Sequence, residues 1–445
     1  MRKINVMTIL LLASATAILF VSCSGTGQPT DGSDSTHPKP PDDSGKVQTT
    51  LSSVLPYDVS LPPQNERVLE TTVRRGFDNF SWHSFIALCW NPEGGLIGEH
   101  GDNATVWETW KYNYEVFLDS GQKPSPWNQL LVKKDKSLFQ TGKTPPDMRA
   151  IFQPFLTGPL IDQNGQYARF EIAINKEMFE YIDNNTLYNI EGQRKFKDTL
   201  RFPSGDSAKK TYGAIMVKAA WKILGKGDDS TKFHRRMATI HTPVTTAQGT
   251  RDSTYEALVG LVGLHIGTKT EVSPQWIWST FEHVDNVPDY GKAVAGKQYN
   301  FYNIAAGEKR LNQVPSQPWN PGKPGQTPSQ IARLTPIDSG TQALNDSIRA
   351  LLVAINPKSV WQYYTLVGTQ WPVHPSASDT GDPFPLYMAN CTLETYDQGS
   401  IQGGKIVYTP NVTSSCINCH NGATTWGGAP SDFTFILKTA KAEKK

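Results

Sequence analysis

The chain has 445 residues, of which 38% are hydrophobic, including 12 Trp, 16 Tyr and 18 Phe, so it can form one large or two medium domains with a substantial core. Its 43 basic and 41 acidic side chains give a formal net charge of +2, without a dense basic run. This balance argues against a nucleic-acid partner, which would require a basic surface.

The first 22 residues have the pattern of an export signal. Residues 1–3 are basic at two positions, residues 7–21 are almost wholly apolar or small, and Cys23 follows a Ser. A Cys directly after a small residue resembles a bacterial lipobox, which implies a diacylglyceryl thioether on Cys23 and cleavage before it. The alternative is a membrane-spanning helix, but the apolar run is short and interrupted by Ser and Thr. We therefore expect a signal peptide over 1–22 and a lipid anchor in the membrane.

The lipid anchor implies a location in the cell envelope of a Gram-negative bacterium, on the periplasmic side or at the outer membrane. Residues 23–60 are rich in Ser, Gly, Thr, Asp and Pro and contain few apolar side chains. Such a stretch cannot bury enough apolar surface to offset its ordering entropy, so we expect a disordered tether. A globular domain is then expected over 61–375, with a C-terminal segment over 376–445 packed on it.

The globular part contains both helical and strand patterns. Helical spacing is expected near 66–90 and from 106 toward Phe117, and a helix capped by Ser339 should run to Ile355 before Pro357. The segments with strand character are 167–174, which a short helix follows, then 213–221, 232–242, 255–270, 275–284 and 361–371. Because strands outnumber helices and do not alternate with them regularly, the pattern predicts an α+β fold with a mainly antiparallel sheet and flanking helices.

Chemistry is concentrated near the C-terminus, where Cys-Ile-Asn-Cys-His occupies residues 416–420. Cys-x-x-Cys-His is the attachment sequence for c-type haem. Two thiols at this spacing can form thioethers with the two vinyl groups on one porphyrin edge, and the adjacent imidazole can bind iron. We therefore expect one covalent haem c on Cys416 and Cys419, with His420 as the proximal iron ligand.

Two other kinds of site use a Cys-x-x-Cys pair. A zinc site needs further soft ligands, and a second Cys-x-x-Cys is absent from the sequence. A redox-active dithiol usually begins a helix after a strand in an αβ pattern, which the Ser-, Asn- and Gly-rich surroundings do not provide. With Cys23 assigned to lipid, Cys89 and Cys391 remain. They could form a disulfide in an oxidising compartment, or each could pack as a small buried thiol.

The chain resembles a family of exported bacterial cytochrome c-type lipoproteins with a single haem, which is largely uncharacterised. The resemblance rests on residues 106–110, 213–221, 261–270, 275–286 and 416–437, which together span most of the globular part. It implies haem binding and electron transfer to a redox partner protein, and it specifies no substrate. The placement of the motif is atypical, because small cytochrome c domains begin with it and supply a Met ligand some tens of residues later.

Only 25 residues follow His420 and none is Met or His, so a second axial ligand must come from upstream. The first candidate is His265, because Gly263 and Gly267 share its strand face and would leave a flat slot for a planar ring. The alternative for His265 is a hydrogen-bonded core histidine. Met388 is the second candidate, although Met more often fills a core.

Other residues also deserve a place among the candidates. His283 lies in a polar cluster, His374 precedes a proline and is expected in a loop, and Trp426 could cover a haem edge or simply pack. Electron transfer is the leading functional hypothesis. The rival is a haem-dependent oxidoreductase with an open iron position, in which His283 with Glu282 or Asp285 would act as the acid–base group. A third possibility is a haem sensor, or a structural haem in a ligand-binding lipoprotein with a Trp-lined site.

Overall fold

The computed structural model describes most of the chain after residue 50. The described residues are 51–61, 70–98, 103–127, 136–139, 158–246, 249–316, 319–320, 322–375, 381–409 and 413–444. The predicted signal peptide, the lipidation candidate Cys23 and the first part of the predicted tether lie outside them. Among the helices of the described residues, none is both long and apolar enough to cross a membrane.

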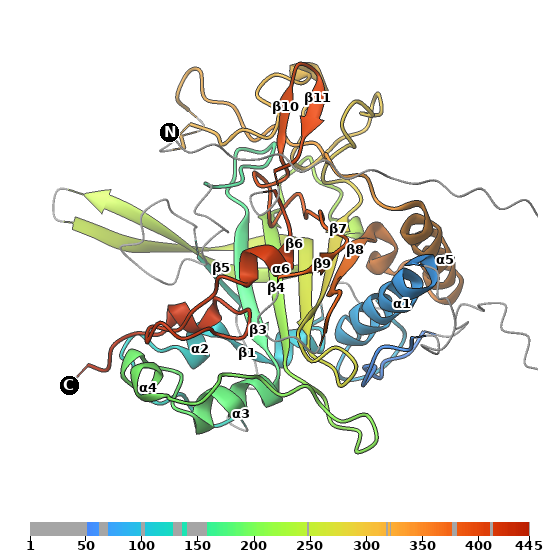
Figure 1. Cartoon of the computed structure of the whole chain (residues 1–445). Helices are drawn as coiled ribbons and strands as arrows, with labels where there is room; N and C mark the ends of the chain where they lie inside the picture. The colour runs from blue at the N-terminus through green and yellow to red at the C-terminus, as the bar shows by residue number, and fades with distance from the viewer. Residues whose placement is uncertain are drawn as a thin grey trace, which may run out of the picture. The chain divides into compact units, whose positions relative to one another are not determined.

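The central element is a sheet of nine strands within the described part of the chain (Figure 1). The strands are β1 (Lys111–Tyr112), β2 (Lys136–Phe139), β3 (Arg169–Ile174), β4 (Ile215–Ile223), β5 (Arg235–Thr246), β6 (Gly249–Thr268), β7 (Ile277–His283), β8 (Tyr364–Pro372) and β9 (Pro383–Phe384). The order is β1-β3-β2-β5-β6-β7-β8-β9, and β4 pairs with β3 and β6. The β2–β5 pair is parallel and the other pairs are antiparallel, so the predicted α+β fold with a mainly antiparallel sheet is confirmed.

The pairings also close a ring that alternation alone does not predict. Strand β3 pairs with β4, β4 with β6, β6 with β5 and β5 with β2, and a single residue pair joins β2 back to β3. Strand β6 is long enough to pair with β5 along its first part and with β7 along its last part. This length lets one strand contribute both to the ring and to the open side of the sheet.

Helices and short turns surround the sheet. The α-helices are α1 (Glu70–Leu88), α2 (Asn113–Val116), α3 (Lys176–Asn184), α4 (Ile190–Lys195), α5 (Ser339–Ile355) and α6 (Cys416–His420). The short 3-10 turns are η1 (Trp107–Thr109), η3 (Ser230–Lys232), η4 (Ile304–Ala306), η5 (Val360–Tyr363) and η6 (Ile436–Thr439), and β10 (Ser400–Gln402) pairs with β11 (Lys405–Val407) in a separate hairpin.

Two helix predictions differ from the structure in detail. Helix α5 has the expected range, but its N-cap is Asp338, whose carboxylate accepts hydrogen bonds from the backbone N–H groups of Gly340 and Thr341. The predicted helical continuation from 106 toward Phe117 is wrong. There the chain makes η1, becomes extended at Trp110, and pairs as β1 with β3 before the single turn of α2.

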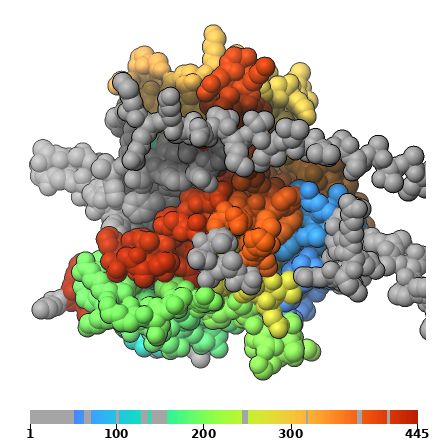
Figure 2. All heavy atoms as spheres, viewed as in Figure 1, coloured from blue at the N-terminus to red at the C-terminus, as the bar shows by residue number. Residues whose placement is uncertain are grey.

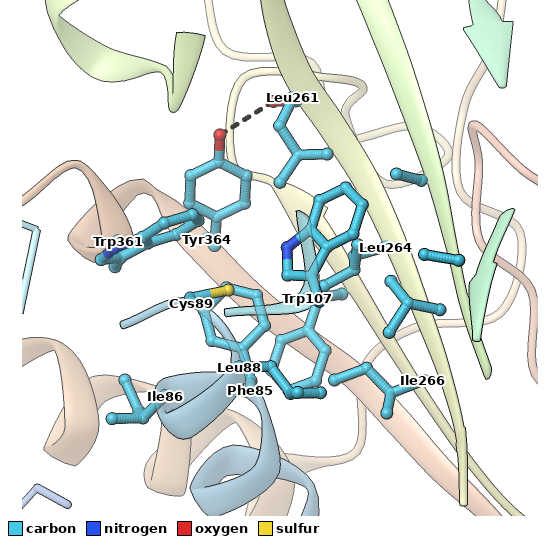
Figure 3. Packing of buried hydrophobic residues seen from close by; sticks show 14 of the residues in the cluster. Phe85, Ile86, Leu88, Cys89, Trp107, Leu261, Leu264, Ile266, Trp361 and Tyr364 are labelled. Atoms are coloured by element: carbon cyan, nitrogen blue, oxygen red, sulfur yellow. Dashed lines mark hydrogen bonds between the residues drawn. The ribbon is translucent and has the colours of Figure 1, made fainter. Parts of the chain in front are cut away.

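One face of the sheet is covered by α1 and α5. Alternate residues of β4, namely Ile215, Val217 and Ala219, belong to the same buried cluster as aromatic side chains of α1 and aliphatic side chains of α5. Figure 3 shows part of this cluster, including Phe85 beside Trp361 and the hydrogen bond from the Tyr364 hydroxyl to the Leu261 carbonyl. The apolar side chains of α1 and α5 recur at helical spacing because they line the face of each helix that packs against this core.

The opposite face is covered by the end of the chain. Met216, between Ile215 and Val217 on β4, belongs to a second cluster with Ile417 of α6 and residues of α3 and η6. Backbone and side-chain hydrogen bonds, such as Ile190 N–H to the Lys441 carbonyl, join the α4 region to the C-terminal residues. Figure 2 shows the C-terminal segment, in red, beside the green segment that contains α3 and α4. The sheet face opposite α1 therefore carries the Cys-x-x-Cys-His motif.

Residues 51–61 pack against the folded part of the chain. Val59 is buried, Leu51 and Leu55 contact the α1-side cluster, and the ring of Tyr57 stacks on Tyr212 at 4.5 Å. The predicted tether over 23–60 is therefore wrong in its last ten residues, because their apolar side chains do find a surface on which to be buried.

Candidate functional site

The Cys-x-x-Cys-His motif forms the short helix α6. Ser415 is its N-cap, and its hydroxyl accepts a hydrogen bond from the Asn418 N–H. The Ile417 N–H donates to the Gln370 Oε1 on β8 at 2.9 Å, and the buried Ile417 side chain packs under the helix. These contacts attach the beginning of α6 to the sheet.

The two motif thiols are free and partly exposed. At a spacing of three residues they lie on the same side of one helical turn. Burial raises the pKa of Cys416 well above its usual range and the pKa of Cys419 to about 12, and the charge of Glu394 acts in the same direction. Both groups are therefore protonated thiols at neutral pH.

The imidazole of His420 is oriented by a backbone carbonyl. Its Nδ1 lies 2.7 Å from the carbonyl oxygen of Phe433, and since a carbonyl can only accept, Nδ1 carries the proton. Burial lowers the pKa of His420 to about 4, so the ring is neutral at pH 7. The Nε2 atom therefore keeps its lone pair, and the ring is held between Trp278 at 4.3 Å and Phe435 at 5.3 Å between centroids.

A row of opposed residues crosses the sheet on the same face as the motif. Lys218 on β4 is opposite His265 on β6, His265 is opposite Thr280 on β7, and Thr280 is opposite Gly368 on β8. The charges of Lys218 and His265 both act on the pKa of His420. The structure thus brings the predicted distal candidate His265 to the neighbourhood of the motif.

Both ring nitrogens of His265 are engaged. Its Nε2 lies 2.6 Å from Glu394 Oε1, and its Nδ1 lies 2.7 Å from the Thr280 hydroxyl. Because a carboxylate can only accept, Nε2 carries a proton that is directed at Glu394, and the Thr280 hydroxyl also accepts a hydrogen bond from Asn390 Nδ2. Burial would raise the pKa of Glu394, but the charge and hydrogen bond of His265 outweigh it and the pKa lies below its usual value.

The slot expected beside His265 is filled at one of its two glycines. A Cβ placed on Gly263 would lie 2.1 Å from Thr392 Oγ1, and one on Gly267 would lie 3.4–3.5 Å from the rings of Trp276 and Trp278. The flat slot expected between the two glycines is therefore closed at Gly263, where Thr392 occupies the space, and at Gly267 two Trp rings lie at ordinary contact distance.

Met388, the second distal candidate, is buried beside β8. Its Sδ would lie 3.1 Å from a Cβ on Gly368, and its backbone N–H donates to the Ser414 carbonyl at 3.0 Å. The backbone of Met388 is thus attached to the residues that precede α6, while its thioether packs over the end of the row that contains His265.

Several buried polar atoms near the motif have no hydrogen-bond partner among the residues that the structure describes. They include Trp278 Nε1, Ser414 Oγ and Asp397 Oδ2. Burial raises the pKa of Asp397 to about 7, and the Glu394 charge raises it further while Lys218 lowers it. Unsatisfied polar atoms of this kind are unusual in a folded interior and are compatible with a polar bound group at this face.

The acid–base group expected around His283 does not lie at the motif. The His283 ring stacks on Phe233 at 4.2 Å, and its Nε2 donates to a backbone carbonyl at 3.1 Å. Glu282 is bound by Arg333 at 2.8 Å, and Asp285 is bound by two lysines. His283, Glu282 and Asp285 are each bound by other groups of the protein. The hypothesis that they form the acid–base group of a haem-dependent oxidoreductase is therefore wrong.

The two remaining candidates, His374 and Trp426, lie at the surface. His374 is exposed just after β8, as expected for a loop residue. Trp426 is 38% exposed and lies beside Lys438, whose Nζ is 5.0 Å from the ring centroid. The contact of Trp426 with Lys438 does not connect this ring to His420.

Cys89 and Cys391 are separate buried thiols. Cys89 belongs to the cluster under α1, as Figure 3 shows, whereas Cys391 belongs to a cluster on the other face of the sheet. The structure has both as free cysteines, so the disulfide alternative is wrong and each thiol packs as a small apolar group.

Residues that sequence reasoning did not select complete the site. Glu394 binds His265, Gln370 holds the start of α6, and the Phe433 carbonyl orients His420. They come from distant segments, and no local pattern marks them. Within the described ranges, three or more His, Cys, Asp or Glu side chains nowhere converge in a metal-binding group. No family model matches the chain, and no curated protein or solved structure matches it either.

Proposed function

We propose that the chain carries one haem c attached through Cys416 and Cys419, with Nε2 of His420 as the proximal iron ligand. The observation that carries this proposal is the hydrogen bond from His420 Nδ1 to the Phe433 carbonyl, which leaves Nε2 as the free, neutral donor. A second hydrogen bond that sets the tautomer is the usual arrangement of a metal-binding histidine. The two free thiols one helical turn apart supply the attachment points.

The chemistry of the thiols favours haem over the other uses of a Cys-x-x-Cys pair. A redox-active dithiol needs a lowered thiol pKa, and here burial raises both pKa values. A structural zinc site needs four ligands, and the described residues bring no such group together. The unpartnered Trp278, Ser414 and Asp397 atoms also fit a bound group with polar substituents.

Electron transfer with a redox partner protein is the function that we propose for the haem. When bound, the group supplies an iron that cycles between the ferric and ferrous states. The His420 imidazole, which would bind the iron, contacts the rings of Trp278 and Phe435, and α6 is partly exposed, so a partner could approach this edge. The sequence pattern around Cys23 supports a location in the cell envelope on a lipid anchor.

One observation favours a second candidate, a haem-dependent oxidoreductase with an open iron position. His265 Nε2 carries a proton and is bound to Glu394, so His265 is arranged as a proton donor and not as a free ligand. In this candidate the His265–Glu394 pair replaces His283 as the acid–base group.

Optical spectroscopy of the matured, full-length protein separates the two functions. Electron transfer predicts a low-spin ferric spectrum that cyanide does not change. A high-spin spectrum that shifts with cyanide would overturn electron transfer in favour of the oxidoreductase. The variants His265→Ala and Met388→Leu then identify the sixth ligand, because only loss of the true ligand converts a low-spin spectrum to high spin.

A further inference from the structure

The backbone that meets His420 is strained at two successive residues. Asp432 has φ 50° and Phe433 has φ 59°, which is the left-handed region. Residues with a Cβ adopt this region at an energetic cost, and a bulky Phe side chain has no local hydrogen bond to offset it. Such strain persists only where the surrounding structure imposes it, and it is concentrated at functional sites.

Contacts of Asp432 impose this conformation. Its carboxylate accepts a hydrogen bond from the Phe202 N–H at 2.7 Å and forms an ion pair with Lys269. Its carbonyl accepts from Trp276 Nε1 at 2.8 Å. Asp432, Lys269 and Trp276 are all buried, so solvent does not weaken these bonds as it would at the surface.

Two of the three anchoring residues come from the turn between β6 and β7, and Phe202 comes from the segment between α4 and β4. Lys269 directly follows β6, and Trp276 directly precedes β7. The Lys269 N–H also donates to the Ala214 carbonyl at 3.0 Å, which attaches the turn to the start of β4. Asp432 is therefore bound to the end of the central sheet through Lys269 and Trp276.

The conformation of these two residues decides where the Phe433 carbonyl points. That oxygen lies 2.7 Å from His420 Nδ1. A relaxed backbone at 432 and 433 would rotate the carbonyl away from the ring. The strain is thus coupled to the one hydrogen bond that selects the His420 tautomer.

We propose that Asp432 and Lys269 act as a positioning pair that holds the Phe433 carbonyl on His420 and so sets the tautomer and electron donation of this imidazole. The consequence for a bound iron rests on the proposed haem function, while the consequence for the tautomer does not. A firm hydrogen bond at Nδ1 makes Nε2 more basic and stabilises the ferric state.

The test compares Asp432→Asn with Asp228→Asn in the full-length protein. Asp228 is a matched control, because its carboxylate also binds a buried lysine, Lys222 at 2.6 Å, and a backbone N–H, that of Gly225 at 2.7 Å. In matured protein, we expect a higher haem reduction potential in Asp432→Asn and an unchanged potential in Asp228→Asn. Equal potentials in the two variants and the wild type would overturn the proposal.

A second arm uses protein in which Cys416→Ala and Cys419→Ala prevent attachment. Nitrogen NMR of the His420 ring should report the Nδ1–H tautomer, and adding Asp432→Asn should shift it toward Nε2–H. An unchanged tautomer would refute the pair even if haem is present, whereas absence of haem from matured wild type would refute only the proposed function. If Asp432→Asn does not fold, Lys269→Gln keeps the carboxylate and is expected to produce the same two shifts.

Discussion

Three histidines of this protein have their protons placed by different acceptors. His420 donates from Nδ1 to the Phe433 carbonyl, whereas His283 donates from Nε2 to a backbone carbonyl and His265 directs Nε2–H at Glu394. The partner of each ring decides which nitrogen remains available. Only His420 combines a free Nε2 with neighbouring thiols, which is why the site is assigned to it.

His283 gives a prediction on pH and stability. Burial lowers its pKa from 6.5 to about 4, so between these values the unfolded chain binds more protons and stability falls as pH falls. Between pH 7 and pH 5 the loss from this residue is about 2 kcal/mol. In His283→Gln, urea unfolding at the two pH values should show a difference smaller by that amount. The exposed His374→Gln is the control, and an undiminished difference in His283→Gln would contradict the assignment.

At the scale of elements, strand β6 contributes to the site through His265, and neighbouring side chains pack against the strand on both sides of this residue. Two of its glycines, Gly263 and Gly267, face the same side as His265, but Thr392 covers Gly263 closely and Trp rings lie at ordinary contact distance from Gly267. Close approach of a neighbouring segment is a frequent reason for glycine in a strand. The packing therefore requires glycine at position 263 but not at position 267 of the same strand face.

Alanine substitution should separate these positions. Gly263→Ala places a Cβ 2.1 Å from Thr392 Oγ1, which is buried and hydrogen-bonded to Asn390, so we expect a loss of about 1–3 kcal/mol. Gly267→Ala meets rings at 3.4 Å and should change the free energy of unfolding by less than about 1 kcal/mol. Equal effects in thermal or urea unfolding would show that the Thr392 contact does not constrain this face.

The elements that can be predicted from the sequence are those with a regular local pattern of apolar side chains. Strand patterns predict β3, β4, β5, β6, β7 and β8, and helical period predicts α1 and α5, because apolar side chains recur along each of these segments. Strand β2 has only four residues and pairs in parallel with β5, about a hundred positions later, so no local pattern reveals it. The cap of α5 and the end of the helical turn at η1 depend on individual hydrogen bonds and on the pairing of β1 with β3, and none of these produces a periodic pattern in the sequence.

At the scale of the whole molecule, the site is assembled from segments far apart in the sequence. The motif itself is local and was predicted from its spacing, and the register of β6 supports the interpretation that His265 faces the same side. Glu394, Gln370 and the Phe433 carbonyl join it only because the C-terminal part folds over the face opposite α1. Tertiary contacts of this kind leave no periodic signal, which explains why they were missed.

The C-terminal cover also places the motif thiols in a defined environment. Ile417 and Ile436 are buried with Met216 of β4, so α6 is part of the folded core and not a flexible tail. Cys416 and Cys419 remain partly exposed on that support. Attachment of a large planar group at this position therefore modifies a preformed surface of the protein.

Intact-protein mass spectrometry of the mature chain tests the central claim most directly. The protein should be produced in a bacterium that matures haem c outside the cytoplasm, then treated with a thiol-alkylating reagent under denaturing conditions. We predict a mass increase of one haem, with Cys89 and Cys391 alkylated and the motif cysteines protected. The Cys416→Ala, Cys419→Ala variant should lack the haem mass. Alkylation of both motif cysteines in the wild-type protein, without tetrapyrrole mass, would contradict the account.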